Sequence, residues 1–150
     1  MKWVTSEGVR VGRVSSAWLI ERFVDPQAVF LFVPAAEVLD TARKEGARSF
    51  HIPGSDLPKR GRETAFEAIV KEYDLSGDRA LVLLSKMVNG ADTDNTLYNQ
   101  PQGSGLRAIV DGFRFLNLAD DGEIVEKAAI VFDALYAHCQ QRVAQRDNLQ

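Results

Sequence analysis

The chain has 150 residues, of which 45% are hydrophobic and 26% are charged, and 18 Lys and Arg against 21 Asp and Glu give a net charge of −3. This composition is typical of a globular domain and excludes a disordered chain, a collagen and a coiled coil. A chain of this length buries enough surface to fold without crosslinks. We predict one domain over residues 1–140, followed by a polar tail over 141–150.

Cysteine content and hydropathy indicate a cytoplasmic protein. The single cysteine, Cys139, has no partner for an internal disulfide, so nothing indicates an oxidising compartment. No apolar run approaches the roughly 18 residues that a membrane helix needs, and the N-terminus does not resemble a signal peptide. The mildly acidic balance also lacks the basic character expected of a nucleic-acid-binding domain.

Short apolar runs and short helical patterns alternate at the start of the chain. Residues 2–5 and 9–14 flank a Ser-Glu-Gly turn and could pair as a hairpin. Ser15 and Ser16 are N-cap residue types in front of an apolar helical run, which ends before Pro26.

A strand, a helix and a second strand are predicted next. Residues 28–33 form a continuous aromatic and β-branched run, which is typical of a strand buried on both faces. A helix then runs from Pro34 to Lys44, with Gly46 as its C-cap. Residues 48–52 form the second strand.

The remaining sequence is mainly helical. Thr64 and Glu67 form a capping box at the start of a helix. Residues 80–88 are apolar nearly all round and predict a buried helix, with a strand over 80–84 as the alternative. Residues 90–94 are expected to form a turn and to start a helix.

Two more helices are predicted toward the C-terminus. One is entered through the glycine-rich residues 101–105. The other starts at Asp120, whose partner in the first turn is Glu123, and its apolar stripe continues to Cys139. The sequence therefore predicts a helix-dominated α+β fold, with two to four short N-terminal strands followed by a helical C-terminal half.

The sequence contains none of the familiar metal or nucleotide motifs. His51 and His138 lie far apart, and there is no CxxC, HxxxH or HExxH pattern, so no metal ligands are predicted. Cys139 is expected to be a packed core residue and His138 a surface or half-buried one. Neither a GxGxxG nor a P-loop motif occurs, and no cofactor is specified by the sequence.

Two groups of charged residues are candidates for ligand binding or catalysis. Asp92 and Asp94 flank Thr93 and can hold a cation or serve as a base, although helix capping explains these residue types more simply. Lys59, Arg60 and Arg62 precede the helix that begins near residue 64. Cations at a helix N-terminus are a plausible cradle for an oxyanion, phosphate or carboxylate, and the alternative is a solvated loop.

Five short segments carry a family resemblance, and they read RVSSAWLIERFVDP from residue 13, FLFVPAAEVL from 30, IPG from 52, GADT from 90 and DALYA from 133. In order and spacing they resemble the C-terminal domain of the chromate-resistance protein ChrB. The resemblance spans about residues 3–140. It implies a role associated with chromate resistance, in a family that looks like chromate-responsive regulators whose separate N-terminal region is implicated in DNA binding. We therefore expect no direct DNA binding by this domain without an additional domain.

The sequence departs from the family pattern where relatives carry histidine and cysteine. Ser16 and Ala17 replace a Cys-Pro pair, Lys59 and Thr64 replace a histidine and a cysteine, and Gly122 replaces another histidine. If those side chains bind metal or perform redox chemistry in relatives, this chain has lost that set. The family positions that remain are Arg13, Trp18, Arg22, Asp25, Asp92, Thr93, Asp133 and Tyr136, with Asp56 where an acid is expected.

These observations together predict a pocket for a small anionic ligand between the first helix and the 59–64 loop. In this hypothesis the cations are Arg13, Arg22, Lys59 and Arg62, the walls are Trp18 and Tyr136, and the residues that orient the cations or carry a proton are Asp56, Asp92 and Asp94. Such a domain would serve as an oxyanion sensor or an accessory protein.

Two other classes of function remain open. One is a small metal-assisted or acid/base enzyme for a carboxylated or phosphorylated metabolite, with Asp92 or Asp56 as its catalytic base. The other is an interaction domain that has lost its ancestral site and binds a protein partner or a second copy of itself.

Overall fold

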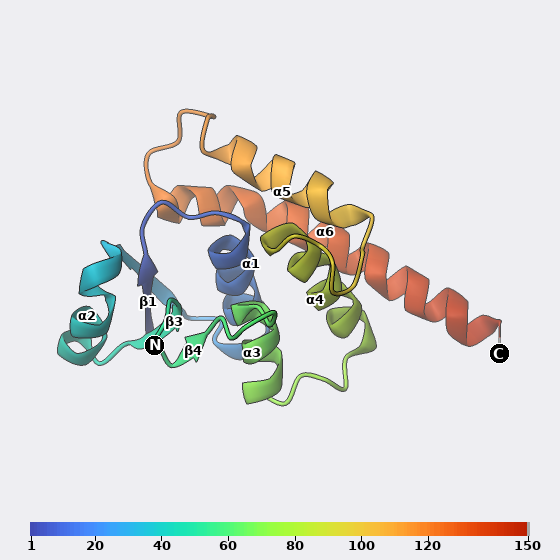
Figure 1. The fold of residues 1–150 in the computed structure, drawn as a ribbon, viewed down its shortest axis with the longest axis horizontal. Coiled ribbons are helices and arrows are strands. Elements are labelled where there is room, and N and C mark those ends of the chain that lie inside the picture. The colour runs from blue at the N-terminus through green and yellow to red at the C-terminus, as the bar shows by residue number, and fades with distance from the viewer. Residues whose placement is uncertain (150) are drawn as a thin grey trace.

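The structure, a computed structural model, describes residues 1–149. Its strands are β1 (Lys2–Ser6), β2 (Val29–Val33), β3 (Arg48–His51) and β4 (Leu57–Pro58). Its α-helices are α1 (Val11–Leu19), α2 (Val38–Glu45), α3 (Ala65–Glu72), α4 (Arg79–Asp92), α5 (Gln102–Phe113) and α6 (Asp121–Asn148). The predicted helix-dominated α+β fold is therefore confirmed (Figure 1).

The four strands form one parallel sheet in the order β2-β1-β3-β4. Val4 of β1 pairs with Leu31 of β2 on one side and with Ser49 of β3 on the other. Helix α1 lies in the crossover from β1 to its parallel neighbour β2, and α2 lies in the connection from β2 to β3, whereas β3 and β4 are joined by residues 52–56 alone. Figure 1 shows the sheet between α2 on one side and α1 with the other helices on the opposite side.

The predicted hairpin is wrong, because residues 9–14 lead into and begin α1 instead of pairing with β1. Ser15 and Ser16 do not cap this helix. They lie inside it, fully buried, and both hydroxyls donate to the carbonyl oxygen of Gly12, at 3.0 and 2.7 Å. These internal bonds satisfy hydroxyl groups that have no access to water. Beyond residue 19 the helix continues as a π-helical turn over Ile20–Val24, and it ends before Pro26 as predicted.

Strand β2 is not buried on both faces, as its composition suggested. It lies at the edge of the sheet, and Val29 is 53% exposed. Its aromatic side chains supply part of the core, since the Phe30 ring packs against Phe50 of β3 with centroids 6.2 Å apart. An edge strand with large apolar residues thus has the same sequence pattern as a central strand.

Most of the predicted helix ends are confirmed. Thr64 and Glu67 form the capping box, Asp120 accepts the backbone N–H of Glu123, and Gly46 ends α2 in the left-handed conformation. Residues 80–88 are helical, so the alternative of a strand at 80–84 is wrong.

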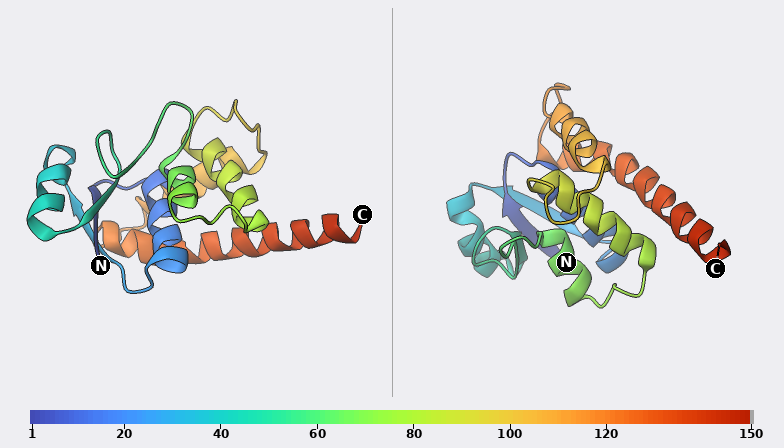
Figure 2. Two further views of the ribbon diagram at one scale, coloured as in Figure 1. Left: turned by 90° about the horizontal axis from the view of Figure 1, so that it is seen from below. Right: turned by 45° about the vertical axis from the view of Figure 1, so that its right-hand side comes forward.

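Helix α4 is longer than predicted, and Asp92 is its last residue. The cluster at 90–94 therefore ends a helix and does not start one. Helix α6 also continues through the residues expected to form a polar tail, and its final turns project from the body of the protein (Figures 1 and 2). Within residues 1–149, no helix combines the length and the apolar character needed to cross a membrane.

A core of large aromatic side chains joins the sheet to the helices. Trp3, Trp18, Phe50, Phe66 and Phe132 are almost completely buried. The Trp18 ring stacks on Phe66 at 6.5 Å with an interplanar angle of 10°. Side chains from α1, α3 and α6 thus meet at Trp18.

Helices α4 and α5 cross where two glycines meet. A Cβ atom built at Gly103 would lie 2.7 Å from the carbonyl carbon of Gly90 and 2.9 Å from its oxygen. The obstruction is backbone, so it cannot rotate away as a side chain would. Gly105, one half-turn further along α5, has nothing within 4 Å of the same position.

We therefore expect Gly103→Ala to reduce the free energy of unfolding by about 1–3 kcal/mol, because the two helices must move apart. Gly105→Ala is the matched control, and we expect it to raise stability by up to about 1 kcal/mol, since alanine is the better helix former. Urea denaturation of both variants checks the prediction. Equal stabilities would show that the helices do not need this close approach.

Candidate functional site

The candidate site lies where the carboxyl ends of β1 and β3 meet the N-terminus of α1. Strand β1 ends at Ser6 and β3 at His51, and α1 begins at Val11. No side chain caps this end of α1, and its first turn contains no acidic residue. Its first backbone N–H groups therefore receive no side-chain cap. The carboxyl edge of a parallel sheet is a common place for ligands.

Three ionisable side chains converge at this edge from separate parts of the chain. His51 ends β3, Lys59 follows β4, and Asp92 ends α4. The Asp92 Oδ2 atom lies 3.3 Å from Lys59 Nζ and 3.7 Å from His51 Nε2. Only 13% of the Asp92 side chain and 16% of the His51 side chain are exposed. These side chains form a group of one acid and two bases, in which the carboxylate and the imidazole are nearly enclosed.

Two atoms of this group lack hydrogen-bond partners. His51 Nε2 and Asp92 Oδ2 are both buried, and neither makes a hydrogen bond within the protein. Their separation of 3.7 Å is too long for a direct bond. Buried polar atoms in proteins are usually satisfied. The pair therefore has unused capacity to donate to, or accept from, a bound molecule.

Gly12 makes the close approach of these side chains to α1 possible. A Cβ atom at this position would lie 2.4 Å from His51 Nε2 and 2.6 Å from Asp92 Oδ2. Any larger residue in the first turn of α1 would therefore displace both groups. The Asp92 carboxylate thus lies against the N-terminal end of the helix, where the helix dipole favours negative charge.

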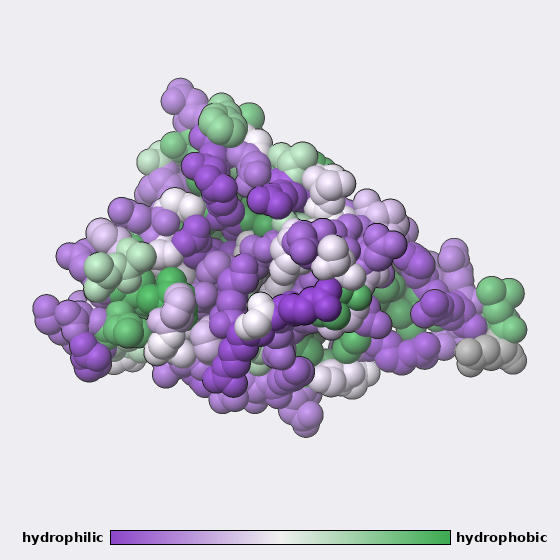
Figure 3. Space-filling model, viewed as in Figure 1, coloured by the Kyte–Doolittle hydropathy of each residue, from purple (hydrophilic) through white to green (hydrophobic). Residues whose placement is uncertain are grey.

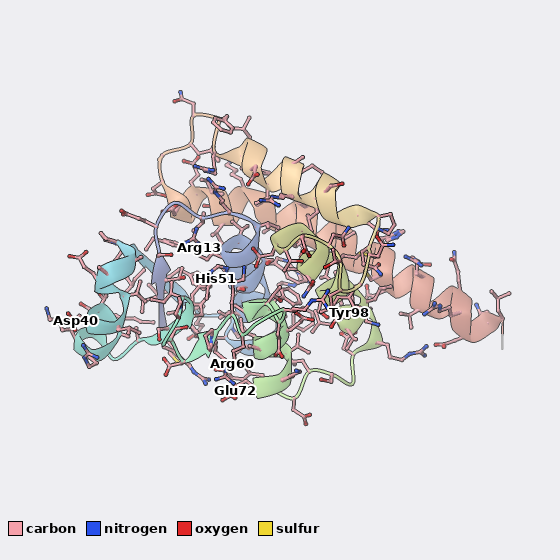
Figure 4. The ribbon with its side chains drawn as sticks, viewed as in Figure 1. Arg13, Asp40, His51, Arg60, Glu72 and Tyr98 are labelled. Atoms are coloured by element: carbon pink, nitrogen blue, oxygen red, sulfur yellow. The ribbon has the colours of Figure 1, made fainter. Side chains whose placement is uncertain are left out.

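Arg13 is the second predicted cation that reaches this region. Its guanidinium donates to Ser6 Oγ and to the carbonyl oxygen of Gly8, the latter at 2.9 Å. Burial lowers the pKa of Arg13, while the charges of Asp121 and Asp92 act in the opposite direction. Figure 4 shows Arg13 and His51 beside α1.

Asp92 is ionised at neutral pH. Burial raises the pKa of Asp92, but the neighbouring His51 and the charge of Lys59 outweigh that effect, and the pKa lies below its ordinary value. The carboxylate therefore holds Lys59 by an ion pair in which Asp92 is shielded from water, while 36% of the Lys59 side chain is exposed.

The other predicted ligand-binding residues lie elsewhere. Trp18 Nε1 donates to Asp133 Oδ1 at 3.0 Å, and Arg22 forms an ion pair with the same oxygen at 3.2 Å. Tyr136 donates to Asp78 at 2.5 Å, and burial together with Asp78 raises the pKa of Tyr136 to about 12. These side chains join α1 to α6 and α6 to α4, so they do not wall the candidate site.

The acidic residues Asp56 and Asp94 have local structural roles. Asp56 accepts hydrogen bonds from the backbone N–H and the hydroxyl of Ser49, at 2.8 and 2.9 Å. Asp94 accepts two bonds from Thr96, whose hydroxyl also accepts from Arg62 at 2.9 Å. Arg62 and Asp94 therefore belong to an exposed loop. The single pocket predicted from the sequence is divided, and only Arg13, Lys59 and Asp92 remain together.

His51 is the site residue that the sequence analysis missed. In the sequence, His51 was visible only as a possible zinc ligand. The sequence feature that could have identified His51 is its place at the end of a predicted strand, because ligands commonly bind at the carboxyl ends of parallel strands. Its backbone φ is +76°, a value that non-glycine residues seldom adopt.

Within residues 1–149, no three His, Cys, Asp or Glu side chains gather as a metal-binding group. Cys139 is buried as predicted, and burial raises its thiol pKa to about 11. His138 is exposed, also as predicted.

Comparison with known proteins identifies the class of domain. Residues 3–139 match the family described as "ChrB, C-terminal domain". The chain belongs to this family, as the sequence resemblance predicted.

A named relative is Protein ChrB of Cupriavidus metallidurans strain CH34, which is 31% identical over 139 residues. The aligned region covers 91% of this chain and 40% of that protein, so the chain spans less than half the length of its relative. No solved structure matches the chain.

Replacing Asp92 by asparagine tests the electrostatics of the site. We expect Asp92→Asn to lower the free energy of unfolding at pH 7 by about 1–3 kcal/mol, because Lys59 loses its buried counter-ion. The folded pKa of Asp92 is depressed, so its contribution is fully present above the unfolded value of about 4 and disappears as the pH falls through the folded value. The wild type should therefore lose more stability than the variant between about pH 5 and pH 3.

Urea denaturation across this pH range checks the expectation. Glu126→Gln is the control, since it removes one negative charge from an exposed position on α6. Parallel pH profiles for the wild type and Asp92→Asn would contradict the interpretation of Asp92 as an ionised buried group.

Proposed function

We propose that the chain is a chromate-resistance-associated domain that binds a small oxyanion at the N-terminal end of α1. Lys59 supplies a full charge, His51 supplies a ring N–H, and the first turn of α1 supplies backbone donors. The observation that carries the proposal is the buried and unpartnered Nε2 atom of His51, located 3.7 Å from the carboxylate that holds Lys59.

The hydrogen-bond donors of the site support an anion as the ligand. The donors are Lys59, Arg13 and the uncapped N–H groups of α1, and the two nearby carboxylates are already engaged, Asp92 by Lys59 and Asp121 by the N–H groups of Gly8 and Val9 at 3.0 Å each. In this proposal Asp92 fixes the position of Lys59 and does not contact the anion itself. An oxyanion then accepts from Lys59, from the ring N–H of His51 and from the first turn of α1.

The membership of the ChrB family supports chromate as the oxyanion, and sulfate is its natural isostere for a test. Because the chain spans less than half of its relative, we expect this domain to supply ligand recognition to a larger system. Any contact with DNA is expected to need an additional domain.

Lys59→Gln tests the proposal. We expect the variant to bind chromate and sulfate at least about tenfold more weakly, since one charge-assisted contact contributes about 1.5–3 kcal/mol. Isothermal titration calorimetry at constant ionic strength measures the change. Lys44→Gln, at an exposed position on α2, is the matched control and should bind as the wild type does. Arg62→Gln should also have little effect, because Arg62 lies in the exposed loop. If Lys59→Gln binds both anions as tightly as the wild type does, the anion does not bind at Lys59.

A second candidate function is supported by the pairing of His51 with Asp92. An imidazole next to a buried carboxylate is a common arrangement for proton transfer, and the unusual backbone of His51 is a feature often found at catalytic residues. This arrangement supports an acid/base enzyme acting on a carboxylated or phosphorylated metabolite. In such an enzyme His51 is the base, and Asp92 orients the imidazole once the 3.7 Å between them closes to hydrogen-bond distance in the complex with substrate.

His51→Asn tests the enzyme function. Asparagine tolerates a positive φ, so the loop should keep its shape while the base is lost. If the domain is an enzyme, turnover of phosphorylated and carboxylated metabolites, followed by mass spectrometry, should fall by at least about 100-fold in the variant. Lys44→Gln again serves as control. Absence of turnover in the wild type would contradict the enzyme function.

A further inference from the structure

A second concentration of positive charge lies in the groove between α4 and α6. The groove contains a cavity of about 210 Å³. Four of its lining residues are cations, namely Arg79, Lys86, Arg142 and Arg146, and none is acidic. This is unusual in a chain with a net charge of −3. We call it the basic groove.

The charges of the basic groove are poorly compensated. Arg79 forms an ion pair with Asp147 at 2.6 Å, and this contact ties the start of α4 to the end of α6. Lys86 Nζ lies 5.7 Å from the centre of the Tyr98 ring. Within residues 1–149, no carboxylate pairs with Lys86, Arg142 or Arg146.

The helix dipole accounts for the position of only one of these cations. Arg146 lies in the last turn of α6, where the helix dipole favours a positive charge. Arg142 and Lys86 lie away from the ends of their helices, and both are half-buried. An anion supplied from outside would compensate the charges that have no counter-ion in the groove.

A larger cavity adjoins the basic groove along α4. Its volume is about 420 Å³, and it shares Val82 and Lys86 with the groove. Its lining includes the apolar or aromatic side chains of Leu97 and Tyr98. It also includes charged residues of both signs, namely Arg60, Arg62, Lys71, Glu63 and Glu67. Figure 4 shows Arg60 and Tyr98 on the same face of the protein, and Figure 3 shows that the middle of this face is mainly hydrophilic.

We infer that the basic groove and the adjoining cavity bind one small polyanion, a molecule with two or more phosphate groups on an apolar or aromatic body. The phosphates lie against Lys86, Arg142 and Arg146, and the body lies in the larger cavity near Tyr98. The volume of the larger cavity is within the range of small-molecule sites. The cations surround two short cavities and do not follow an extended track, which favours a small molecule over a nucleic-acid strand.

The double variant Arg142→Gln/Arg146→Gln tests the inference. The probes are inorganic tripolyphosphate and ATP, titrated by calorimetry into the full chain at constant ionic strength. We expect both probes to bind the wild type and to bind the double variant at least about tenfold more weakly. The matched control is Arg107→Gln/Lys127→Gln, which removes two exposed cations outside the basic groove and should change the affinity by less than about twofold.

Three results would overturn the inference. One is no binding of either probe at millimolar concentration, and another is an equal loss in the control, which would indicate a general charge effect. The third is a preference for single-stranded oligonucleotides that grows with their length, which would indicate a nucleic-acid surface. Lys59→Gln should still bind both probes, so failure of the oxyanion site and failure of the basic groove are distinguishable.

Discussion

The structure depends on the burial of α1 on almost all of its sides. Eight of its nine residues are buried, and the helix contacts β3, α3, α4, α5 and α6. A helix can be surrounded so closely only if many of its residues are small. Gly12, Ser15, Ser16 and Ala17 meet this requirement, and the two serine hydroxyls bond within the helix, so neither hydroxyl is left unsatisfied. The positions of the other elements follow from the space that these small residues leave.

The candidate site follows from the same constraint. Because α1 is central, the elements around it bring residues distant in sequence to its N-terminal end. His51 arrives from the sheet, Lys59 from the loop after β4, and Asp92 from the end of α4. A buried carboxylate beside a cation remains ionised, and this holds the cation in place. The group is therefore preorganised without any ligand.

Features that depend on neighbouring residues were predictable from the sequence. The capping box of Thr64 and Glu67 involves two residues of one helical turn, and the apolar run at 80–88 is helical and buried. The parallel order of the strands was not predictable in this way, because the Ser-Glu-Gly turn after β1 is compatible with a hairpin. Likewise, the aromatic composition of residues 28–33 could not distinguish an edge strand from a central one.

The candidate site was predictable only in part, for a similar reason. A cationic loop and an aspartate near residue 92 were visible in the sequence, but their pairing across α1 depends on the tertiary fold. Trp18 and Tyr136 are large aromatic residues with a polar atom, and this residue type serves equally well in a core and in a ligand pocket. Trp18 donates to Asp133 and Tyr136 donates to Asp78, so both side chains belong to the packed interior between the helices and not to a ligand pocket.

The left-handed backbone of His51 also limits how this position can vary. Glycine, asparagine and aspartate tolerate such a conformation, whereas β-branched residues do not. These tolerated residues differ widely in chemistry, from no side chain to an amide or a carboxylate. Related domains can therefore exchange the chemical group at this position while the loop after β3 keeps its path, and the ligand can change without a change of fold.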